Sequence, residues 1–291
     1  MDLTISNDQP LVSVIIPTRN ADKIIERCLE SIQLQSYRNL EIIIVDNYSS
    51  DDTRRIAEKY HTKFITVGPP PPYNNFFTAP MQRKIGAEYA KGSLLFFVDA
   101  DMILSRGLIK ECLKKCEEGA DAITISEISF GTGFWAKCKK IERACYINDP
   151  RIEAPRFMKK SAYIEAGGWN EKVGAFDDWD LAKRLRVCNL KIGRCTNNYI
   201  LHDEGHLTLR SLFLKKYRMG KTVDLVKHIS GQSLSAISYQ LTPLRIIFLL
   251  RKSVLFTKNP IYILGMFVMK LIETTGMLIG FFMRTHKLHK I

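Results

Sequence analysis

The sequence predicts an α/β protein with a mostly parallel central sheet, because apolar runs of strand length alternate with segments of helical periodicity. The predicted strands are short apolar runs bounded by polar or proline residues, and they cover 11–17, 41–46, 64–67, 94–98, 120–126 and 199–201. The predicted helices repeat apolar residues at helical spacing or begin with an acidic turn, and they cover 24–32, 53–60, 81–91, 105–118 and 177–187. Strands joined by helices pair in parallel through right-handed connections.

Two segments do not fit this alternation. Residues 68–80 are rich in proline, which favours a stiff and exposed loop. Residues 127–160 show no regular periodicity, so the sequence assigns no helix or strand there. With 291 residues, the chain is long enough for one large α/β domain with an appendage, or for two modest domains.

Asp99 and Asp101 follow the predicted strand 94–98, whose continuous apolar run is typical of a strand buried on both faces. In open α/β sheets, ligands bind beyond the carboxyl ends of such strands. Two aspartates one residue apart on a turn can face a divalent cation that is shared with the phosphates of a ligand. A solvated turn with two ordinary aspartates is the alternative that this motif alone leaves open.

Charge is distributed unevenly along the chain. Residues 1–206 carry 29 Lys and Arg against 28 Asp and Glu, whereas residues 207–291 carry 14 Lys and Arg against only Asp224 and Glu273. A nearly neutral body with a basic tail indicates that the tail has an anionic partner of its own. The basic residues of the tail alternate with long aliphatic runs, which suits a lipid surface better than a nucleic acid.

The most hydrophobic segments, 246–256 and 261–283, lie in this basic tail. The second segment is long enough to span a bilayer, but Lys270 and Glu273 lie at its middle, where charges are costly. We therefore expect helices that lie in or dip into a membrane interface and are anchored by Lys and Arg. A helical subdomain that packs these faces together is the alternative.

The seven cysteines form no CxxC pair and no metal-binding spacing with histidine. The first residues are polar and do not resemble a signal peptide. We therefore expect reduced, buried thiols and a location on the cytosolic side.

Five short motifs follow one another along the chain, at 14–20 (VIIPTRN), 45–53 (VDNYSSDDT), 97–101 (FVDAD), 167–171 (GGWNE) and 177–181 (DDWDL). In this order they closely resemble the motifs of the family 2 glycosyltransferases, and the resemblance covers residues 10–205. It implies the GT-A fold, a Rossmann-like arrangement, together with a nucleotide-sugar donor, a Mn2+ or Mg2+ ion and inversion of the anomeric centre.

The resemblance assigns donor binding to residues near the ends of the first strands. The loop after the first strand matches the wall of the nucleotide site with Pro17, Thr18 and Asn20. Asp46 matches the acid that binds the base edge, where a carboxylate can accept from a ring N–H, although an aspartate there can also cap a turn. Arg83 matches the basic residue near the donor phosphates, and Lys84 replaces the asparagine that usually follows it.

The same resemblance points to Asp101 as the direct metal ligand and to Asp99 as a residue that faces the metal or the ribose. His202 follows the predicted strand 199–201 and matches the histidine that completes the metal shell in many members. His206 is the alternative ligand.

Asp178 matches the family's general base, which takes a proton from the acceptor. Asp177 stands where the family usually has glutamate, and we place it on the acceptor side with Trp169 and Arg156. Arg156 is included because its surroundings resemble relatives that act on lipid-linked acceptors, and a structural salt bridge is the alternative for this residue. The alternative for Asp177 and Asp178 is an ordinary pair of acids at a helix N-terminus, where the helix dipole favours them.

These features predict a GT-A catalytic domain over 1–206, with a nucleotide-sugar-binding half at 1–104 and an acceptor half at 105–206. A helical, membrane-associating extension follows over 207–291. The expected activity is inverting transfer of a hexose or N-acetylhexosamine from a UDP- or GDP-sugar to a polyprenyl-phosphate or lipid-linked acceptor, at the cytoplasmic face of a membrane.

Three other functions stay open: transfer to a soluble or polysaccharide acceptor, sensing of a sugar nucleotide without catalysis, and binding of nucleic acid. A sensor has no need of a base at Asp178, and the aliphatic tail argues against nucleic acid. The sequence does not decide the sugar, the acceptor or the oligomeric state.

Overall fold

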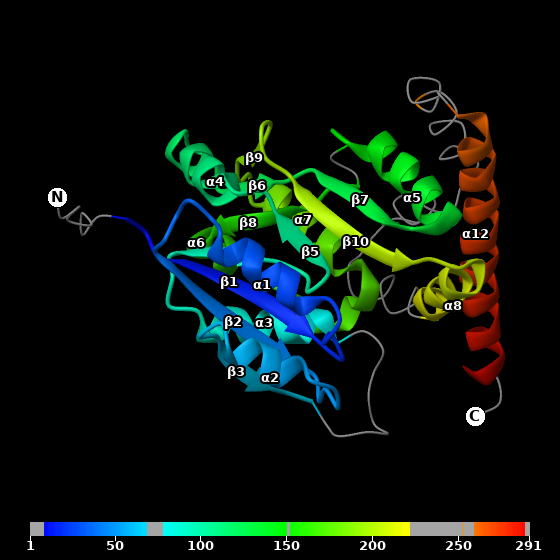
Figure 1. Cartoon of the computed structure of the whole chain (residues 1–291), viewed down its shortest axis with the longest axis horizontal. Coiled ribbons are helices and arrows are strands. Elements are labelled where there is room, and N and C mark those ends of the chain that lie inside the picture. Colours follow the sequence, from blue (N-terminus) through cyan, green and yellow to red (C-terminus); the bar gives the residue numbers. More distant parts are fainter. Residues whose placement is uncertain (1–8, 69–77, 150–151, 222–251, 253–258, 289–291) are drawn as a thin grey trace. The chain divides into compact units, whose positions relative to one another are not determined.

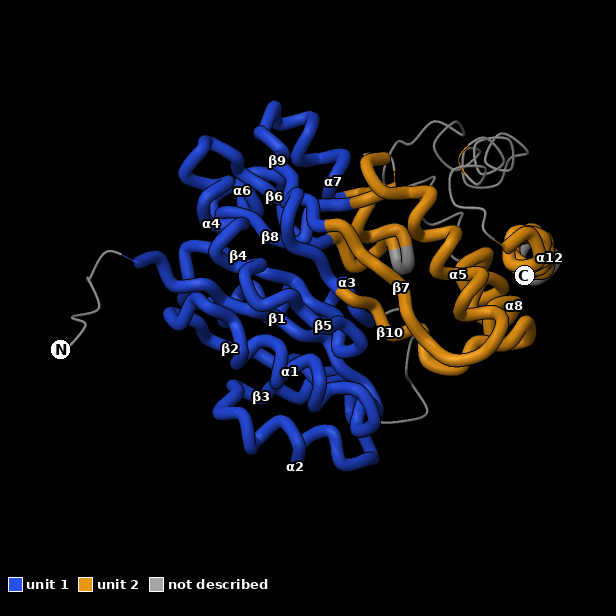
Figure 2. Tube along the Cα trace, turned by 45° about the horizontal axis from the view of Figure 1, so that its top comes forward, with its two compact units in different colours: residues 1–125, 154–169, 181–200 blue, residues 126–153, 170–180, 201–291 orange. Residues whose placement is uncertain are grey.

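The computed structural model describes residues 9–68, 78–149, 152–221, 252 and 259–288, which form two compact units (Figure 2). The units are made of separate stretches of chain: unit 1 comprises 1–125, 154–169 and 181–200, and unit 2 comprises 126–153, 170–180 and 201–291. The division into a catalytic domain over 1–206 and an extension over 207–291 stays a prediction. The compact units divide the chain elsewhere, because parts of the middle of the chain fold with the C-terminal helices.

Unit 1 is built on a seven-stranded sheet with the order β3-β2-β1-β4-β8-β6-β9 (Figure 1). Its strands are β1 (Val12–Thr18), β2 (Leu40–Asp46), β3 (Lys63–Thr66), β4 (Leu94–Phe97), β6 (Ala122–Thr124), β8 (Pro155–Lys159) and β9 (Ile192–Arg194). Strand β1 pairs in parallel with β2 and β4, and β2 pairs in parallel with β3. Strand β8 runs antiparallel to β4 and β6. The predicted mostly parallel α/β sheet is therefore confirmed.

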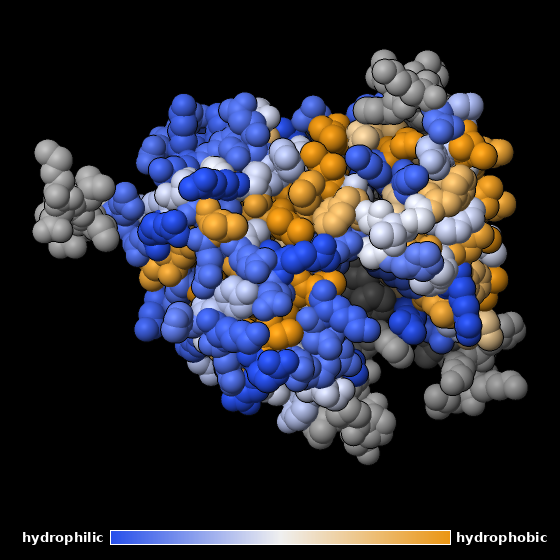
Figure 3. All heavy atoms as spheres, in the orientation of Figure 1, coloured by the Kyte–Doolittle hydropathy of each residue, from blue (hydrophilic) through white to orange (hydrophobic). Residues whose placement is uncertain are grey.

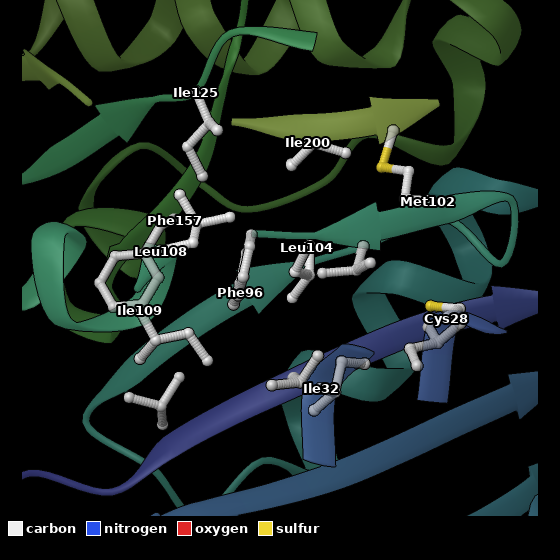
Figure 4. Close-up of a cluster of buried hydrophobic side chains, with 14 of the residues drawn as sticks. Cys28, Ile32, Phe96, Met102, Leu104, Leu108, Ile109, Ile125, Phe157 and Ile200 are labelled. Carbon is white, nitrogen blue, oxygen red and sulfur yellow. The ribbon is translucent and has the colours of Figure 1, made fainter. Parts of the chain in front are cut away.

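Alternating side chains along the strands supply both faces of this sheet. Phe96 of β4 belongs to a buried cluster with Cys28 of α1 and Leu108 of α4 (Figure 4). The adjacent Leu95 belongs to the cluster on the other face, together with Tyr163 of α6. Because β4 is covered on both faces, all its side chains must be apolar, which explains the uninterrupted run in the sequence.

The helices of unit 1 are α1 (Ile25–Gln33), α2 (Thr53–Glu58), α3 (Ala79–Tyr89), α4 (Leu108–Glu117) and α6 (Lys160–Glu165), and β5 (Met102–Leu104) follows β4.

Unit 2 is mainly helical. Its elements are β7 (Glu127–Thr132), α5 (Gly133–Tyr146), a 3-10 helix (Glu171–Phe176), β10 (Ile200–His206, almost entirely in this unit), α8 (Leu209–Gly220) and α12 (Pro260–Leu288). Strand β10 is hydrogen-bonded to β7. Helix α7 (Asp177–Val187) begins in unit 2 and ends in unit 1. The unit has a core of its own, in which Cys138 of α5, Leu212 of α8 and Met266 of α12 are buried.

Several elements were missed by the sequence analysis or lie outside what the structure describes. The interval 127–160 holds β7, α5 and β8, although no element was predicted there, and β9 and α6 were also missed. Segment 246–256 lies outside the described residues apart from Lys252, as does most of the proline-rich segment 68–80. All seven cysteines are free, as expected, but Cys116 and Cys188 are only partly buried.

The two charges that interrupt segment 261–283 are buried within unit 2. Lys270 Nζ lies 2.5 Å from Glu273 Oε2 and also pairs with Glu142 of α5. Lys139 Nζ lies 2.9 Å from Glu142 Oε2 and 3.2 Å from Glu273 Oε1. Burial opposes the charged forms, but the neighbouring opposite charges raise the pKa of Lys139 and hold the pKa of Glu273 well below its ordinary range. Two cations and two anions thus neutralise one another between α5 and α12.

Helix α12 packs closely on α8 through two glycines. A Cβ atom at Gly276 would lie 2.6 Å from the carbonyl oxygen of Phe213, and one at Gly280 would lie 2.1 Å from that of Tyr217. The four-residue spacing places both glycines on one face of α12, where the lack of side chains lets the two backbones approach.

We expect Gly280→Ala to lower the free energy of unfolding by about 1–3 kcal/mol, because the added methyl group forces α8 and α12 apart. Thr275→Ala, on the exposed side of the same helix, is the matched control and changes stability by only about 0.5 kcal/mol or less. Denaturant unfolding of the full chain measures both variants. Equal stabilities would contradict the close packing of these helices.

A carboxylate on α4 holds the loop that leads into β10. Glu111 is 9% exposed and accepts hydrogen bonds from the backbone N–H groups of Thr196 (2.6 Å), Asn197 (3.1 Å) and Asn198 (2.8 Å). Burial alone raises the pKa of Glu111, but these bonds to the ionised form outweigh burial, and the pKa lies below its ordinary value of 4.5.

We expect Glu111→Gln to lower the free energy of unfolding at pH 7 by about 1.5–3 kcal/mol, because charge-assisted bonds to three N–H groups are weakened. The folded pKa is depressed, so the contribution of Glu111 is complete above pH 4.5 and is lost as the pH falls through the folded pKa. Urea unfolding at several pH values measures the difference between the two chains. A difference that stays constant as the solution is acidified would contradict this role.

Candidate active site

The predicted donor-side residues gather at the carboxyl ends of parallel strands in unit 1. Strand β1 lies between β2 and β4, so that Thr18 at its end stands opposite Asp46 in the register. After β1 the chain continues to β2 on one side and reaches β4 on the other side only later. The strand order therefore reverses at the carboxyl end of β1. Ligands of open α/β sheets bind at such a point.

Asp46 is 2% exposed and organises the loop that follows β2. Its carboxylate accepts hydrogen bonds from Thr18 Oγ1 at 3.0 Å, from Ser49 N at 2.8 Å and from Ser49 Oγ at 2.5 Å. The turn-capping role that the sequence left open for Asp46 is therefore present. Contact with a nucleobase stays a prediction for this residue and for the loop that it holds.

Asn20 connects the loops that follow β1 and β2. Its N–H donates to Ser49 Oγ at 2.7 Å, and its side-chain oxygen accepts from Ser50 N at 2.9 Å. Asn20 has a φ of 48°, a left-handed conformation that asparagine tolerates better than most residues. Pro17 lies within β1, opposite Val45 of β2, so it borders the site from the strand rather than from the loop.

Helix α3 reaches the same strand ends because Gly86 lets it lie close to the sheet. A Cβ atom at Gly86 would lie 2.3 Å from Ile15 Cγ2 of β1. One turn earlier in α3, the buried Gln82 donates from Nε2 to the carbonyl oxygens of Thr18 at 2.8 Å and Val45 at 2.6 Å. The sequence analysis did not single out Gln82, whose only signal is its place beside Arg83.

Two arginines hold the carboxylate of Asp99. Arg83 Nη2 lies 2.6 Å from Asp99 Oδ1, and Arg156 Nη1 lies 3.2 Å from Asp99 Oδ2. Both guanidinium groups are largely buried, and the Asp99 side chain is about a quarter exposed. Two cations thus face one anion at the carboxyl end of β4.

Trp169 supports this arrangement from within the core. Its ring lies under the Arg83 guanidinium, with 5.0 Å from Arg83 Cζ to the ring centroid, and packs edge-on against Phe97 at 5.1 Å. Trp169 is 4% exposed. The structure therefore places Trp169 beneath Arg83, and Arg156 against Asp99, on the side predicted for the donor. The predicted acceptor role of these two residues stays untested.

The metal-ligand set predicted from the sequence is spread over both units, since Asp99 and Asp101 belong to unit 1 and His202 to unit 2. In the described part of the chain, no group of three or more His, Cys, Asp or Glu side chains is arranged to hold a metal ion. Mg2+ and Mn2+ often need only one or two protein carboxylates, since waters and ligand phosphates complete their shell. Asp101 suits that use, whereas the oxygens of Asp99 face arginines.

His202 takes part in a polar network of unit 2. Its Nδ1 lies 3.1 Å from Glu127 Oε2 and 3.2 Å from Arg143 Nη2. Arg143 also pairs with Glu127 at 2.6 Å and with Glu204 at 3.5 Å. Burial would raise the pKa of Glu204, but the neighbouring positive charges and the hydroxyl of Ser129 hold it below its ordinary value. If Nδ1 carries the hydrogen, it donates to Glu127, a pattern common for histidines that bind metals through Nε2. His206, the alternative ligand, is exposed.

Helix α7 begins as predicted at Asp177, with three acids in its first turn. Asp177 and Asp180 are buried, whereas Asp178 is partly exposed. The position at a helix N-terminus fits the structural alternative for these acids, and the partial exposure of Asp178 distinguishes it from its neighbours.

Comparison with known proteins gives the same family as the sequence motifs. The glycosyl transferase family 2 model matches residues 13–170, which is more than half of the chain. The chain is similar to the uncharacterized glycosyltransferase EpsJ of Bacillus subtilis, with 28% identity over 156 residues that cover 54% of this chain and 42% of EpsJ. It is also 32% identical over 116 residues to the GalNAc(5)-diNAcBac-PP-undecaprenol beta-1,3-glucosyltransferase of Campylobacter jejuni, covering 38% of this chain and 36% of that protein.

Solved structures show a similar fold. The mannosyltransferase PcManGT of Pyrobaculum calidifontis, in complex with GDP-Man and Mn2+, superposes with a TM-score of 0.58 at 17% identity, covering 90% of this chain and 74% of that one. S. aureus TarS 1-349 superposes with a TM-score of 0.52 at 14% identity, covering 91% of this chain and 88% of that one. These neighbours confirm the predicted GT-A fold. The matched region spans less than half the length of the two relatives named above.

Proposed function

Since the chain belongs to glycosyltransferase family 2, we propose that it transfers a sugar from a nucleotide-sugar donor to an acceptor with inversion at the anomeric carbon. The observation that carries this proposal is the group formed by Arg83, Asp99 and Arg156 at the carboxyl ends of the parallel strands. Two guanidinium groups at this place would suit the phosphates of a nucleoside diphosphate.

The donor side is supported by the way its residues are held. Arg83 and Arg156 are fixed by Asp99, so they are preorganised to stabilise the negative charge that develops on the leaving diphosphate. The loop anchored on Asp46 is the part of the site that we assign to the nucleoside. UDP-sugars and GDP-sugars are both candidates, because the solved neighbours hold UDP-GlcNAc and GDP-Man.

We assign a Mn2+ or Mg2+ ion to Asp101, with His202 as a second ligand. The PcManGT structure holds Mn2+ together with its GDP-sugar, which supports an ion in this role. When bound, such an ion stabilises the charge of the leaving diphosphate without a proton.

We assign the general base to Asp178. Inversion by a single displacement requires a group that takes the proton of the acceptor on the face opposite the leaving group. Asp178 is the more exposed of the acids at the start of α7, so it is the one that an acceptor can reach. Asp177 is buried beside it and is assigned to the acceptor side.

For the acceptor, we propose a polyprenyl-phosphate or lipid-linked saccharide at the cytoplasmic face of a membrane. The Campylobacter jejuni relative is named for a sugar chain linked to undecaprenol diphosphate. In addition, the stretch Pro260–Met283 of α12 is long and apolar enough to cross a membrane, and 44% of its most apolar 18 residues are buried in the protein. Transfer to a polysaccharide is the competing possibility, since TarS is named for poly(ribitol-phosphate).

Incubation of the full chain with a panel of UDP- and GDP-sugars and Mn2+ tests the reaction itself. We expect slow hydrolysis of one donor, and transfer when extracted lipid-linked acceptors are added. Asp101→Asn is expected to abolish both. The proposal would be contradicted if no donor were hydrolysed or transferred and if Asp101→Asn bound nucleotide as the parent does.

We expect Arg156→Met to weaken binding of the matching nucleoside diphosphate about tenfold or more, which corresponds to about 1.4 kcal/mol. The variant removes one of the two cations at Asp99 while keeping the length of the side chain. Arg54→Met, at an exposed arginine of α2, is the matched control and leaves binding unchanged. Calorimetric titration measures both variants, and equal affinities would remove Arg156 from the donor site.

We expect Asp178→Asn to reduce kcat about 10²–10⁴-fold, because the amide cannot take the acceptor proton. The dissociation constant of the nucleotide is expected to stay the same, and so is the activity of Glu118→Gln, which alters an exposed glutamate at the end of α4. Steady-state rates and nucleotide titrations of each variant provide the comparison. A variant Asp178→Asn that retains parental kcat would exclude Asp178 as the base.

A further inference from the structure

Helix α12 has one face packed into unit 2 and one face exposed. The packed face carries the two charges, three glycines and three methionines: Gly265, Met266, Met269, Lys270, Glu273, Gly276, Met277 and Gly280. The exposed face, called the outer face below, consists of Ile261, Leu264, Val268, Leu271, Thr275, Leu278, Ile279, Phe282 and Met283. These positions follow one another at intervals of three and four, so they form one continuous stripe along the helix.

The outer face is almost entirely apolar. Leu264 and Leu271 are 65% and 68% exposed, and Phe282 is 60% exposed. Figure 3 shows hydrophobic residues gathered over α12. Both charges of the stretch 260–283 point inward, into the pairs with Lys139 and Glu142 of α5. A stripe of this length without polar residues other than Thr275 is costly in water and marks an interaction surface.

The exposed charges on α5, α8 and the part of α12 up to Met283 are all basic. They are Lys137 and Lys140 on α5 and Arg210, Lys215 and Arg218 on α8. The acids of these helices are Glu142 and Glu273, and both are buried. Lys137 Nζ lies 3.4 Å from the hydroxyl of Tyr262 at the start of α12, so one of these cations adjoins the same helix as the apolar stripe. An apolar face accompanied only by basic charge complements an anionic lipid surface.

A second copy of the chain fits the outer face less well. Helices that pair in water carry charged residues beside their apolar seam, and these charges set the partner and the register. The positions beside the stripe are apolar or small, including Ile263, Phe267 and Ile272, and the described part of α12 has no exposed charge up to Met283. Lipid acyl chains place no such demand on the flanking positions.

A transmembrane orientation is also disfavoured by the packing. Gly276 and Gly280 bring the backbone of α12 against Phe213 and Tyr217 of α8, and Lys270 is paired with α5. If α12 crossed a bilayer while keeping these contacts, the exposed Lys and Arg of α5 and α8 would enter the hydrocarbon, where charged side chains are costly. A helix lying in the plane of the interface needs no such burial.

We propose that α12 is an in-plane membrane anchor, whose outer face inserts into an anionic leaflet while the basic residues of α5 and α8 meet lipid headgroups. The inference deepens the membrane association in the proposed function and specifies its partner as an anionic lipid surface. It does not require glycosyl transfer, so the two proposals can fail separately.

Flotation of the full chain with vesicles tests the anchor. We expect binding to vesicles of phosphatidylcholine with phosphatidylglycerol, and weaker binding to phosphatidylcholine alone. Leu271→Glu and Leu264→Glu are expected to weaken binding at least tenfold. Leu34→Glu, at a leucine of unit 1 that is 63% exposed, is the matched control and keeps parental binding. Thermal unfolding without vesicles verifies that each variant is folded. Parental binding by folded Leu271→Glu, or no binding by the parent, would overturn the proposal.

Depth-dependent quenching by brominated lipids distinguishes in-plane from transmembrane orientation. Tryptophan is introduced by Ile261→Trp, Leu271→Trp and Phe282→Trp, and the quenching is measured relative to the parent chain. An in-plane helix predicts similar, shallow depths at the three positions. A tryptophan that lies deep in the bilayer at position 271 and shallow at 261 and 282 would show a transmembrane helix and overturn the proposal. A dimer in vesicle-free sedimentation that Leu271→Glu dissociates would assign the face to a second copy and overturn it as well.

Discussion

The candidate site depends on the ion pairs that hold Asp99 between two arginines. Arg83 comes from α3, which can lie against β1 because Gly86 has no side chain. Arg156 comes from β8, whose antiparallel pairing places Phe157 opposite Phe96 and thereby brings the preceding residue to the end of β4. The fixed carboxylate turns two flexible cations into a preorganised group, which is what stabilisation of a departing diphosphate requires.

Ion pairs also hold the helices of unit 2 together. Two lysines and two glutamates lie between α5 and α12, and each ion is paired with an opposite charge. Removing one partner from such a cluster is strongly destabilising, because it leaves a buried charge uncompensated. The pairs keep α12 attached to α5 through the charges on its inner side, and its outer side is left to apolar residues.

The sequence predicted the parallel strands and their ends because these rest on local patterns. The apolar run 94–98 and the aspartates after it indicated both β4 and the site. The start of α7 at Asp177 was also predicted from its acidic first turn. By contrast, α5 was missed because Lys139 and Glu142 belong to its buried face and break the apolar periodicity that marks a helix. The place of Arg156 depends on the register of β8 against β4, which is a long-range pairing without a local signal.

The most direct test of the central claim is a crystal structure of the full chain with its nucleoside diphosphate and Mn2+. The account predicts diphosphate oxygens within hydrogen-bonding distance of Arg83 or Arg156 and the ion on Asp101. A nucleotide bound away from the carboxyl ends of β1, β2 and β4, with the ion on other residues, would contradict it.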